Sequence, residues 1–162
     1  MKKLVIYYSL EGNTRFVAQN IADAIGGEIL ELKPKESIPQ KGVMKYLLGG
    51  KKVLFKEKPA LISLDKDPNE YDVIFIGTPV WASSYAPYFN TLLSSIELKN
   101  KKIGLFCCYR GSAGKTFAHL EKQLEGNHIV GKMEFKEPIK VEENKSKIRE
   151  WANSIIERIS VH

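Results

Sequence analysis

The stretch YYSLEGNTRFVAQNIA, residues 7–22, joins an apolar run to a Gly-Asn-Thr turn and then to a helical pattern. Apolar side chains recur at Val17, Ile21 and Ile25, close to the period of an amphipathic helix. A Gly-Gly pair at 26–27 supplies a stop signal of the kind found at helix ends. The segment is therefore predicted to form a strand, a tight turn and a helix, which is the opening unit of an α/β fold.

The turn in this stretch contains residue types that suit an anion. A helix start offers unpaired backbone N–H groups at the positive end of the helix dipole, and these attract phosphate. Ser9 and Thr14 add hydroxyl groups, and Gly12 lets the backbone approach a ligand closely. Asn13 is the expected N-cap. A phosphate site is predicted here, although an ordinary capped turn would use the same residues.

The rest of the chain repeats this alternation of strand and helix. Apolar runs predict strands at 2–8, 28–32, 71–77, 102–109 and 129–135. After the first helix, further helices are expected near 43–48, 87–95 and 115–124, and over the stripe Ile148, Trp151, Ala152, Ile155 and Ile159. Continuous apolar strands are typical of a parallel sheet covered on both faces. With right-handed crossovers, the pattern predicts an α/β doubly wound three-layer sandwich, with residues 1–162 forming a single domain.

The composition fits a soluble globular protein, with 43% hydrophobic and 27% charged residues. A chain of 162 residues can bury a core of ordinary size in one domain. No stretch approaches the roughly 20 apolar residues that a membrane-spanning helix needs. The five apolar residues after Lys3 are too few for the core of a signal peptide, so a cytoplasmic location is expected.

The charge is unevenly distributed along the chain. The net charge is +6, and eight lysines lie between Lys33 and Lys58, opposed there by Glu36 and Glu57. Such a run is either a solvated face or an electrostatic footprint for an acidic partner or an anionic substrate. No nucleic-acid recognition motif accompanies it, so neither a nucleic-acid partner nor a membrane partner is expected.

The two cysteines, Cys107 and Cys108, are adjacent. This spacing fits neither a Cys-x-x-Cys redox pair nor a set of zinc ligands, and the three histidines show no ligand spacing either. We therefore expect two reduced thiols near the end of a buried strand and no metal site.

Ligands of doubly wound folds bind beyond the carboxyl ends of the strands, where the strand order reverses. Three segments follow such strand ends in this chain, at 9–14, 78–85 and 109–114. The first, SLEGNT, resembles the flavodoxin phosphate signature, in which Ser/Thr-x-Thr-Gly-x-Thr binds the phosphate of flavin mononucleotide (FMN). We call residues 9–14 the phosphate loop.

The phosphate loop matches that signature at Ser9, Gly12 and Thr14, with Asn13 at the free position. It departs at Glu11, where the family usually has a hydroxyl residue. A carboxylate about 4 Å from a phosphate would cost on the order of 1 to 4 kcal/mol. Glu11 is therefore expected to turn outward and to offer the phosphate only its backbone N–H.

The second segment, GTPVWASSYAP, resembles the flavodoxin loop that runs along the isoalloxazine ring and supplies a flanking aromatic side chain. Trp81 is the first candidate for stacking and Tyr85 the second, while Thr78 and Pro79 would fix the turn beside the ribityl chain. The third segment, YRGSAG, resembles the loop that covers the other face and edge of the ring. Its Tyr109 is expected either to stack on the ring or to pack into the sheet edge.

The resemblance covers nearly the whole chain, because the order of the elements and all three segments agree. It implies a flavodoxin-like five-stranded parallel sheet in the order 2-1-3-4-5, and FMN as cofactor. The cofactor-binding residues that it implies are Ser9, Leu10, Glu11, Gly12, Asn13, Thr14, Thr78, Pro79, Val80, Trp81, Ala82, Cys108, Tyr109, Arg110, Gly111, Ser112 and Gly114.

Two other interpretations of these segments fail. The run YRGSAGKT resembles a Walker A loop, but Tyr109 stands where that motif needs its first glycine. A response-regulator receiver domain would need an aspartate where Thr78 stands and an acidic pair where Ser9 stands.

Two functions of different class remain open. The first is electron transfer between protein partners, with FMN carrying the electrons and no catalytic residue in the chain. The second is an FMN-dependent NAD(P)H oxidoreductase that reduces quinones or other small acceptors. The redox partner and the oligomeric state cannot be predicted from this sequence.

Two sequence features bear on the reduction potentials of a bound flavin. Arg110 is predicted near the N1/O2 edge of the ring, where positive charge would make the second reduction potential less negative. No glycine stands between Thr78 and Pro87 to allow a peptide flip without strain. The one-electron-reduced flavin is therefore expected to be less favoured than in flavodoxins that have such a glycine.

Overall fold

The computed structural model describes residues 1–36 and 57–161. Its strands are β1 (Lys3–Tyr7), β2 (Glu28–Glu31), β3 (Val73–Trp81), β4 (Ser84–Tyr85), β5 (Lys102–Tyr109) and β6 (His128–Lys136). Its helices are α1 (Asn13–Ile25), α3 (Tyr88–Ser95), α4 (Thr116–Gln123) and α5 (Asn144–Ser160), with short 3-10 turns η2 (Pro68–Glu70) and η3 (Pro138–Lys140). The helix expected near 43–48 lies outside the described residues.

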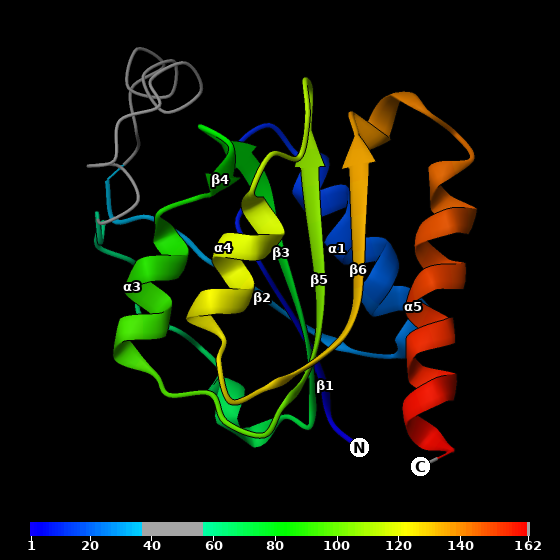
Figure 1. Ribbon diagram of the computed structural model, residues 1–162, viewed down its shortest axis with the longest axis horizontal. Helices are drawn as coiled ribbons and strands as arrows, with labels where there is room; N and C mark the ends of the chain where they lie inside the picture. The colour runs from blue at the N-terminus through cyan, green and yellow to red at the C-terminus, as the bar shows by residue number, and fades with distance from the viewer. Residues whose placement is uncertain (37–56, 162) are drawn as a thin grey trace.

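Five strands form one parallel sheet in the order β2-β1-β3-β5-β6. This order confirms the predicted 2-1-3-4-5 arrangement (Figure 1). Parallel strands are buried on both faces, and the central strands are accordingly apolar along most of their length. Val73, Ile74, Phe75 and Ile76 of β3 are all fully buried.

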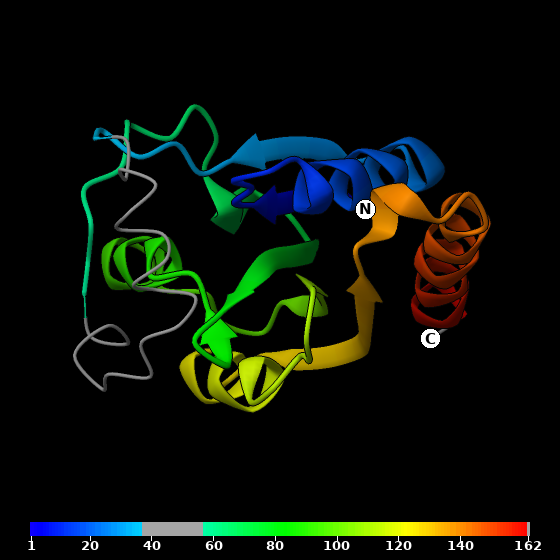
Figure 2. The same cartoon turned by 90° about the horizontal axis from the view of Figure 1, so that it is seen from above.

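Helices cover both faces of the sheet, as Figure 2 shows from above. On one face, Val17 and Ile21 of α1 share a buried cluster with Ile148 and Ile155 of α5. On the other face, Leu92 of α3 and Leu120 of α4 belong to a second cluster. Each fully buried aliphatic side chain contributes about 1.5–3 kcal/mol. The three-layer sandwich is thus confirmed, and the helical stripes that were read from the sequence face the sheet.

The strand predicted to end at residue 77 is longer than expected. It continues as β3 to Trp81 and then returns as β4, with Val80 opposite Tyr85 and Trp81 opposite Ser84. Most of the predicted second loop is therefore a β-hairpin. It was missed because the two turn residues, Ala82 and Ser83, do not include the Asn or Gly that normally marks such a turn.

The flanks of the segment between the two described parts are joined. The Lys35 N–H donates to the Ala60 carbonyl at 2.9 Å, and the Ile62 N–H donates to the Lys33 carbonyl at 2.8 Å. An isolated antiparallel bridge pairs Pro34 with Leu61 between them. The described parts of the chain contain no helix of sufficient length and hydrophobicity to cross a bilayer.

Candidate functional site

The three predicted segments meet at the carboxyl end of the sheet around a cavity of about 340 Å³. This volume lies within the range of small-molecule sites. The cavity is lined by Ser9, Leu10, Glu11, Asn13, Thr14, Pro79, Val80, Trp81, Ala82, Ser83, Cys108, Tyr109, Arg110, Gly111 and Ser112. Of the predicted site residues, Gly12, Thr78 and Gly114 lie outside this lining, and Ser83 is a lining residue that was not predicted.

The phosphate loop ends at an uncapped helix start. Gly12 adopts a left-handed φ of 98°, and its N–H donates to Ser9 Oγ at 3.1 Å. Gly12, and not Asn13, is therefore the N-cap of α1, because the left-handed turn that only glycine adopts freely begins the helix one residue earlier. Within the described residues, no side chain caps this helix start. The first amides of any helix lack partners within the helix, and here no capping side chain accepts from them either, so they favour an anion.

The floor of the cavity combines a hydroxyl and a thiol. Thr14 and Cys108 are both almost fully buried. Burial raises the pKa of Cys108 to about 12, although a hydrogen bond with the Thr14 side chain opposes the shift. Burial also raises the pKa of the neighbouring Cys107. Because successive strand residues face opposite sides of the sheet, Cys107 and Cys108 lie on different faces. Both cysteines are free thiols in a buried strand, as predicted.

The hairpin that forms one wall of the cavity is strained at its turn. Ala82 and Ser83 both have positive φ, at 48° and 64°, and each residue in this conformation costs roughly 1–2 kcal/mol. The Lys115 N–H donates to the Ser83 carbonyl at 2.8 Å and so holds the turn. A Cβ on Gly114 would come within 1.9 Å of Ser83 Oγ. Gly114 therefore permits this packing without itself lining the cavity.

Two buried hydroxyls brace the base of the same hairpin. Thr78 Oγ1 donates to the Pro79 carbonyl at 2.8 Å and accepts from the Ala86 N–H at 2.9 Å. Thr78 thus supports the turn beside the cavity, although it does not border the cavity. The fully buried Ser84 hydroxyl lies 2.8 Å from Nδ1 of His119 and joins β4 to α4.

The aromatic wall of the cavity is anchored in the core. Trp81 borders the cavity but is only 3% exposed. Its ring packs at steep angles against Tyr8 and Tyr88, with centroid distances of 5.4 and 6.2 Å. Tyr8 and Tyr88 also contact each other, at 4.3 Å. The position of the indole is therefore set by protein contacts.

The other two predicted aromatic residues differ in position. The Tyr85 hydroxyl donates to Asn90 Oδ1 at 2.7 Å, and its ring packs edge-on against Phe89. Tyr85 is absent from the lining formed by the described residues, whereas Tyr109 is half-buried and forms part of it. Trp81 and Tyr109 are therefore the aromatic side chains that border the cavity.

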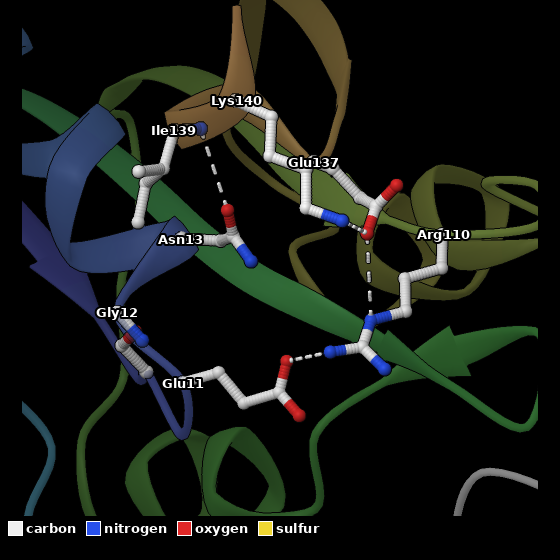
Figure 3. Close-up of polar contacts among 8 residues, drawn as sticks. Glu11, Gly12, Asn13, Arg110, Glu137, Ile139 and Lys140 are labelled. Carbon is white, nitrogen blue, oxygen red and sulfur yellow. Dashed lines mark hydrogen bonds and ion pairs between the residues drawn. The ribbon is translucent and has the colours of Figure 1, made fainter.

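Charged side chains form a row of ion pairs, of which Glu11 and Arg110 line the cavity (Figure 3). Arg110 Nη2 lies 2.5 Å from Glu11 Oε2, and Arg110 Nε lies 3.9 Å from Glu137 Oε1. Lys140 Nζ lies 2.8 Å from the same Glu137 oxygen and, with Arg110, lowers the pKa of that carboxyl group. We call Glu11, Arg110, Glu137 and Lys140 the ion chain. The Glu11 side chain is 47% exposed but points toward Arg110 rather than only into solvent.

The turn η3 lies against the phosphate loop. A Cβ on Gly12 would lie 3.8 Å from Cδ1 of Ile139, and the Ile139 N–H donates to Asn13 Oδ1 at 3.5 Å. Glu137, at the start of η3, has a positive φ of 41°. This contact has no local sequence signal, because more than a hundred residues separate the two segments.

The fold and the cavity together define a doubly wound α/β protein with an uncapped helix start and an aromatic wall at its switch point. Residues 2–155 match the Flavodoxin family model, and the chain belongs to that family. A search of curated proteins found no match.

Solved structures with the same fold include flavoproteins. A protein from Bacteroides eggerthii, provisionally classed as a flavoprotein, is 26% identical, with 96% of this chain and 98% of that chain covered and a TM-score of 0.72. A flavoprotein from Lactobacillus acidophilus, solved in complex with FMN, is 26% identical, with 88% and 97% covered and a TM-score of 0.65. A flavodoxin from the domain Archaea, 16% identical, shares the fold with a TM-score of 0.62 over 99% of each chain.

Proposed function

We propose that this protein binds FMN and transfers electrons between redox partners. The observation that carries the proposal is the meeting of an uncapped helix start, an aromatic wall and a third loop around one cavity in a member of the flavodoxin family. The Lactobacillus acidophilus flavoprotein, which binds FMN, supports the same cofactor here.

The residues present fit the parts of FMN. The amides at the start of α1 and the hydroxyls of Ser9 and Thr14 would hold the phosphate. Trp81 and Tyr109 would border the planar ring and exclude water from its faces. When bound, FMN supplies the redox chemistry, since it can accept and release electrons singly or in pairs. The chain itself binds, orients and shields the cofactor.

The carrier function is favoured by the rim of the cavity. Leu10, which lines the cavity, is 41% exposed, and Ile139, which lies against the phosphate loop, is 53% exposed. Exposed apolar side chains beside a cofactor suit a transient contact with a protein partner. No group of the described residues marks a nicotinamide site, whereas the lack of a glycine between Thr78 and Pro87 is a feature that leans toward the two-electron chemistry of the reductase.

The proposal is tested by purifying the protein without added flavin, recording its absorbance spectrum and then adding NADH or NADPH without oxygen. A carrier would be yellow, or would take up FMN tightly, and would stay oxidised until a separate reductase is added. Bleaching by NAD(P)H alone, followed by turnover of a quinone, would contradict the carrier function. A colourless protein without saturable FMN uptake would contradict both.

A further inference from the structure

We infer that Arg110 is the counter-ion that allows a carboxylate in the phosphate loop, so that the Glu11–Arg110 pair preserves the preference of the cavity for the phosphorylated flavin. In this role Arg110 is a positioning residue that acts through Glu11. The inference rests on the proposed binding of FMN.

The need for a counter-ion follows from where Glu11 lies. It stands between Ser9 and Gly12 and lines the same cavity as the uncapped start of α1. An unpaired carboxylate there would repel a phosphate dianion, and screened repulsion over a few ångströms weakens binding on the order of fivefold or more. The guanidinium 2.5 Å away cancels that charge.

The position of Arg110 is determined by the sheet. It follows directly after β5, and the Glu137 N–H donates to the carbonyl of its neighbour Tyr109 at 3.0 Å. Arg110 lies between the carboxylates of Glu11 and Glu137, and Lys140 forms an ion pair with Glu137 (Figure 3). The ion chain therefore alternates in sign and has no net formal charge, which leaves the helix start to attract the phosphate.

The pair is too exposed for a major role in folding. The side chains of Arg110 and Glu11 are 66% and 47% exposed, and ion pairs of this kind contribute little to stability. Neutral variants should therefore fold, and their effects should appear in ligand binding. Riboflavin supplies the discriminating comparison, since it has the ring and the ribityl chain of FMN but lacks the phosphate.

The test measures the dissociation constants of FMN and riboflavin for the apoprotein and for Arg110→Gln, Glu11→Gln and the double variant. Arg110→Gln should weaken FMN binding about fivefold or more and change riboflavin binding by less than about twofold. The double variant should return to within about twofold of the original FMN affinity, because the unpaired carboxylate is gone. Arg110→Lys should retain most of the FMN affinity.

A matched pair outside the cavity controls for net charge. Lys132 Nζ lies 2.9 Å from Glu121 Oε1, on β6 and α4, and both side chains are partly exposed. Lys132→Gln removes the same formal charge as Arg110→Gln and should leave both dissociation constants unchanged. Urea unfolding of every variant verifies that the fold is intact.

Three outcomes would overturn the inference. If Arg110→Gln weakened FMN binding by the same factor with and without Glu11, Arg110 would contact the phosphate itself. An equal loss for riboflavin would assign Arg110 to the ring or to the shape of the third loop. If the unaltered protein bound riboflavin as tightly as FMN, the site would not recognise the phosphate. If it bound neither flavin, the proposed function itself would be wrong.

Discussion

The indole ring of Trp81 meets the phenol ring of Tyr8 edge-on, with ring centroids 5.4 Å apart and an angle of 84° between their planes. This arrangement is one of the favoured geometries of aromatic pairs. Tyr8 follows β1 and Trp81 ends β3, so the contact ties the start of the phosphate loop to the hairpin wall. The wall of the cavity is therefore preorganised by the core.

Trp81→Phe should reduce both stability and flavin affinity. A smaller ring leaves part of a well-packed volume empty, at a cost of about 1–2 kcal/mol in the free energy of unfolding. FMN and riboflavin should lose affinity by the same factor, because the phosphate is not involved. Urea unfolding and titration with both flavins check this. Tyr85→Phe, which alters an aromatic residue outside the cavity lining, should affect stability but leave the affinities unchanged.

Gly114→Ala should disturb the hairpin more than a positive φ alone explains. Its φ is 56°, and the new Cβ would approach Ser83 Oγ to 1.9 Å and Ser83 Cα to 2.8 Å. Gly26 has a similar φ of 61°, with open space around its Cβ position in the described structure. Gly26→Ala should cost about 1 kcal/mol, whereas Gly114→Ala should cost at least about 2 kcal/mol and should also weaken FMN binding. Equal losses in the two variants would show that the clash relaxes freely.

Ala82→Gly should stabilise the protein. Relief of the left-handed strain of about 1–2 kcal/mol is partly offset by the greater backbone entropy of glycine in the unfolded chain, which costs about 0.5–1 kcal/mol. A net gain of several tenths of a kcal/mol or more is expected in chemical denaturation. Ser83→Gly should gain less, because Ser83 Oγ also accepts from the Lys115 N–H at 3.3 Å. A loss of stability in Ala82→Gly would contradict the strained turn.

Most of the fold could be predicted because its signals are local. Apolar runs and helical stripes placed the expected strands and helices of the described residues within two residues of their observed ends, with two exceptions. These are the carboxyl end of β3 and the amino end of α5, which begins at Asn144, four residues before the predicted stripe. The extension of β3 to Trp81 was missed, since the turn at Ala82 and Ser83 relies on strained non-glycine residues that give no turn signal.

The loops of the candidate site were predicted from the sequence, but the ion pairs between the loops were not. Asn13 was wrongly expected as N-cap, because a preference for Asn does not reveal the left-handed φ of Gly12. Arg110 was predicted as a positive charge near the N1/O2 edge of the ring, and its ion pairs with Glu11 and Glu137 were not predicted. Such pairings depend on which strand ends become neighbours, and spacing along the chain does not contain that information.

Ionisation of the buried Cys108 thiol should lower the stability of the protein at alkaline pH. Its pKa of about 12 in the folded state exceeds the ordinary value of 9.0, so the unfolded chain releases the proton first. The contribution of the protonated thiol to the free energy of unfolding is complete below pH 9 and is lost as the pH rises toward 12, at about 1.4 kcal/mol per pH unit. The difference in stability between the unaltered protein and Cys108→Ala should therefore shrink by about 1 kcal/mol or more between pH 8 and pH 10. A constant difference over this range would contradict the shift.

The bridge between Pro34 and Leu61 means that the segment between them can be replaced by protein engineering. Residues 37–56 contain five lysines and no acidic residue, so they account for five of the six net positive charges of the chain. Because the flanks at 33–35 and 60–62 are already hydrogen-bonded to each other, a short turn could replace residues 37–56 without moving a strand of the sheet. The protein that remained would be almost electroneutral, and its FMN binding could be compared directly with that of the lysine-bearing form.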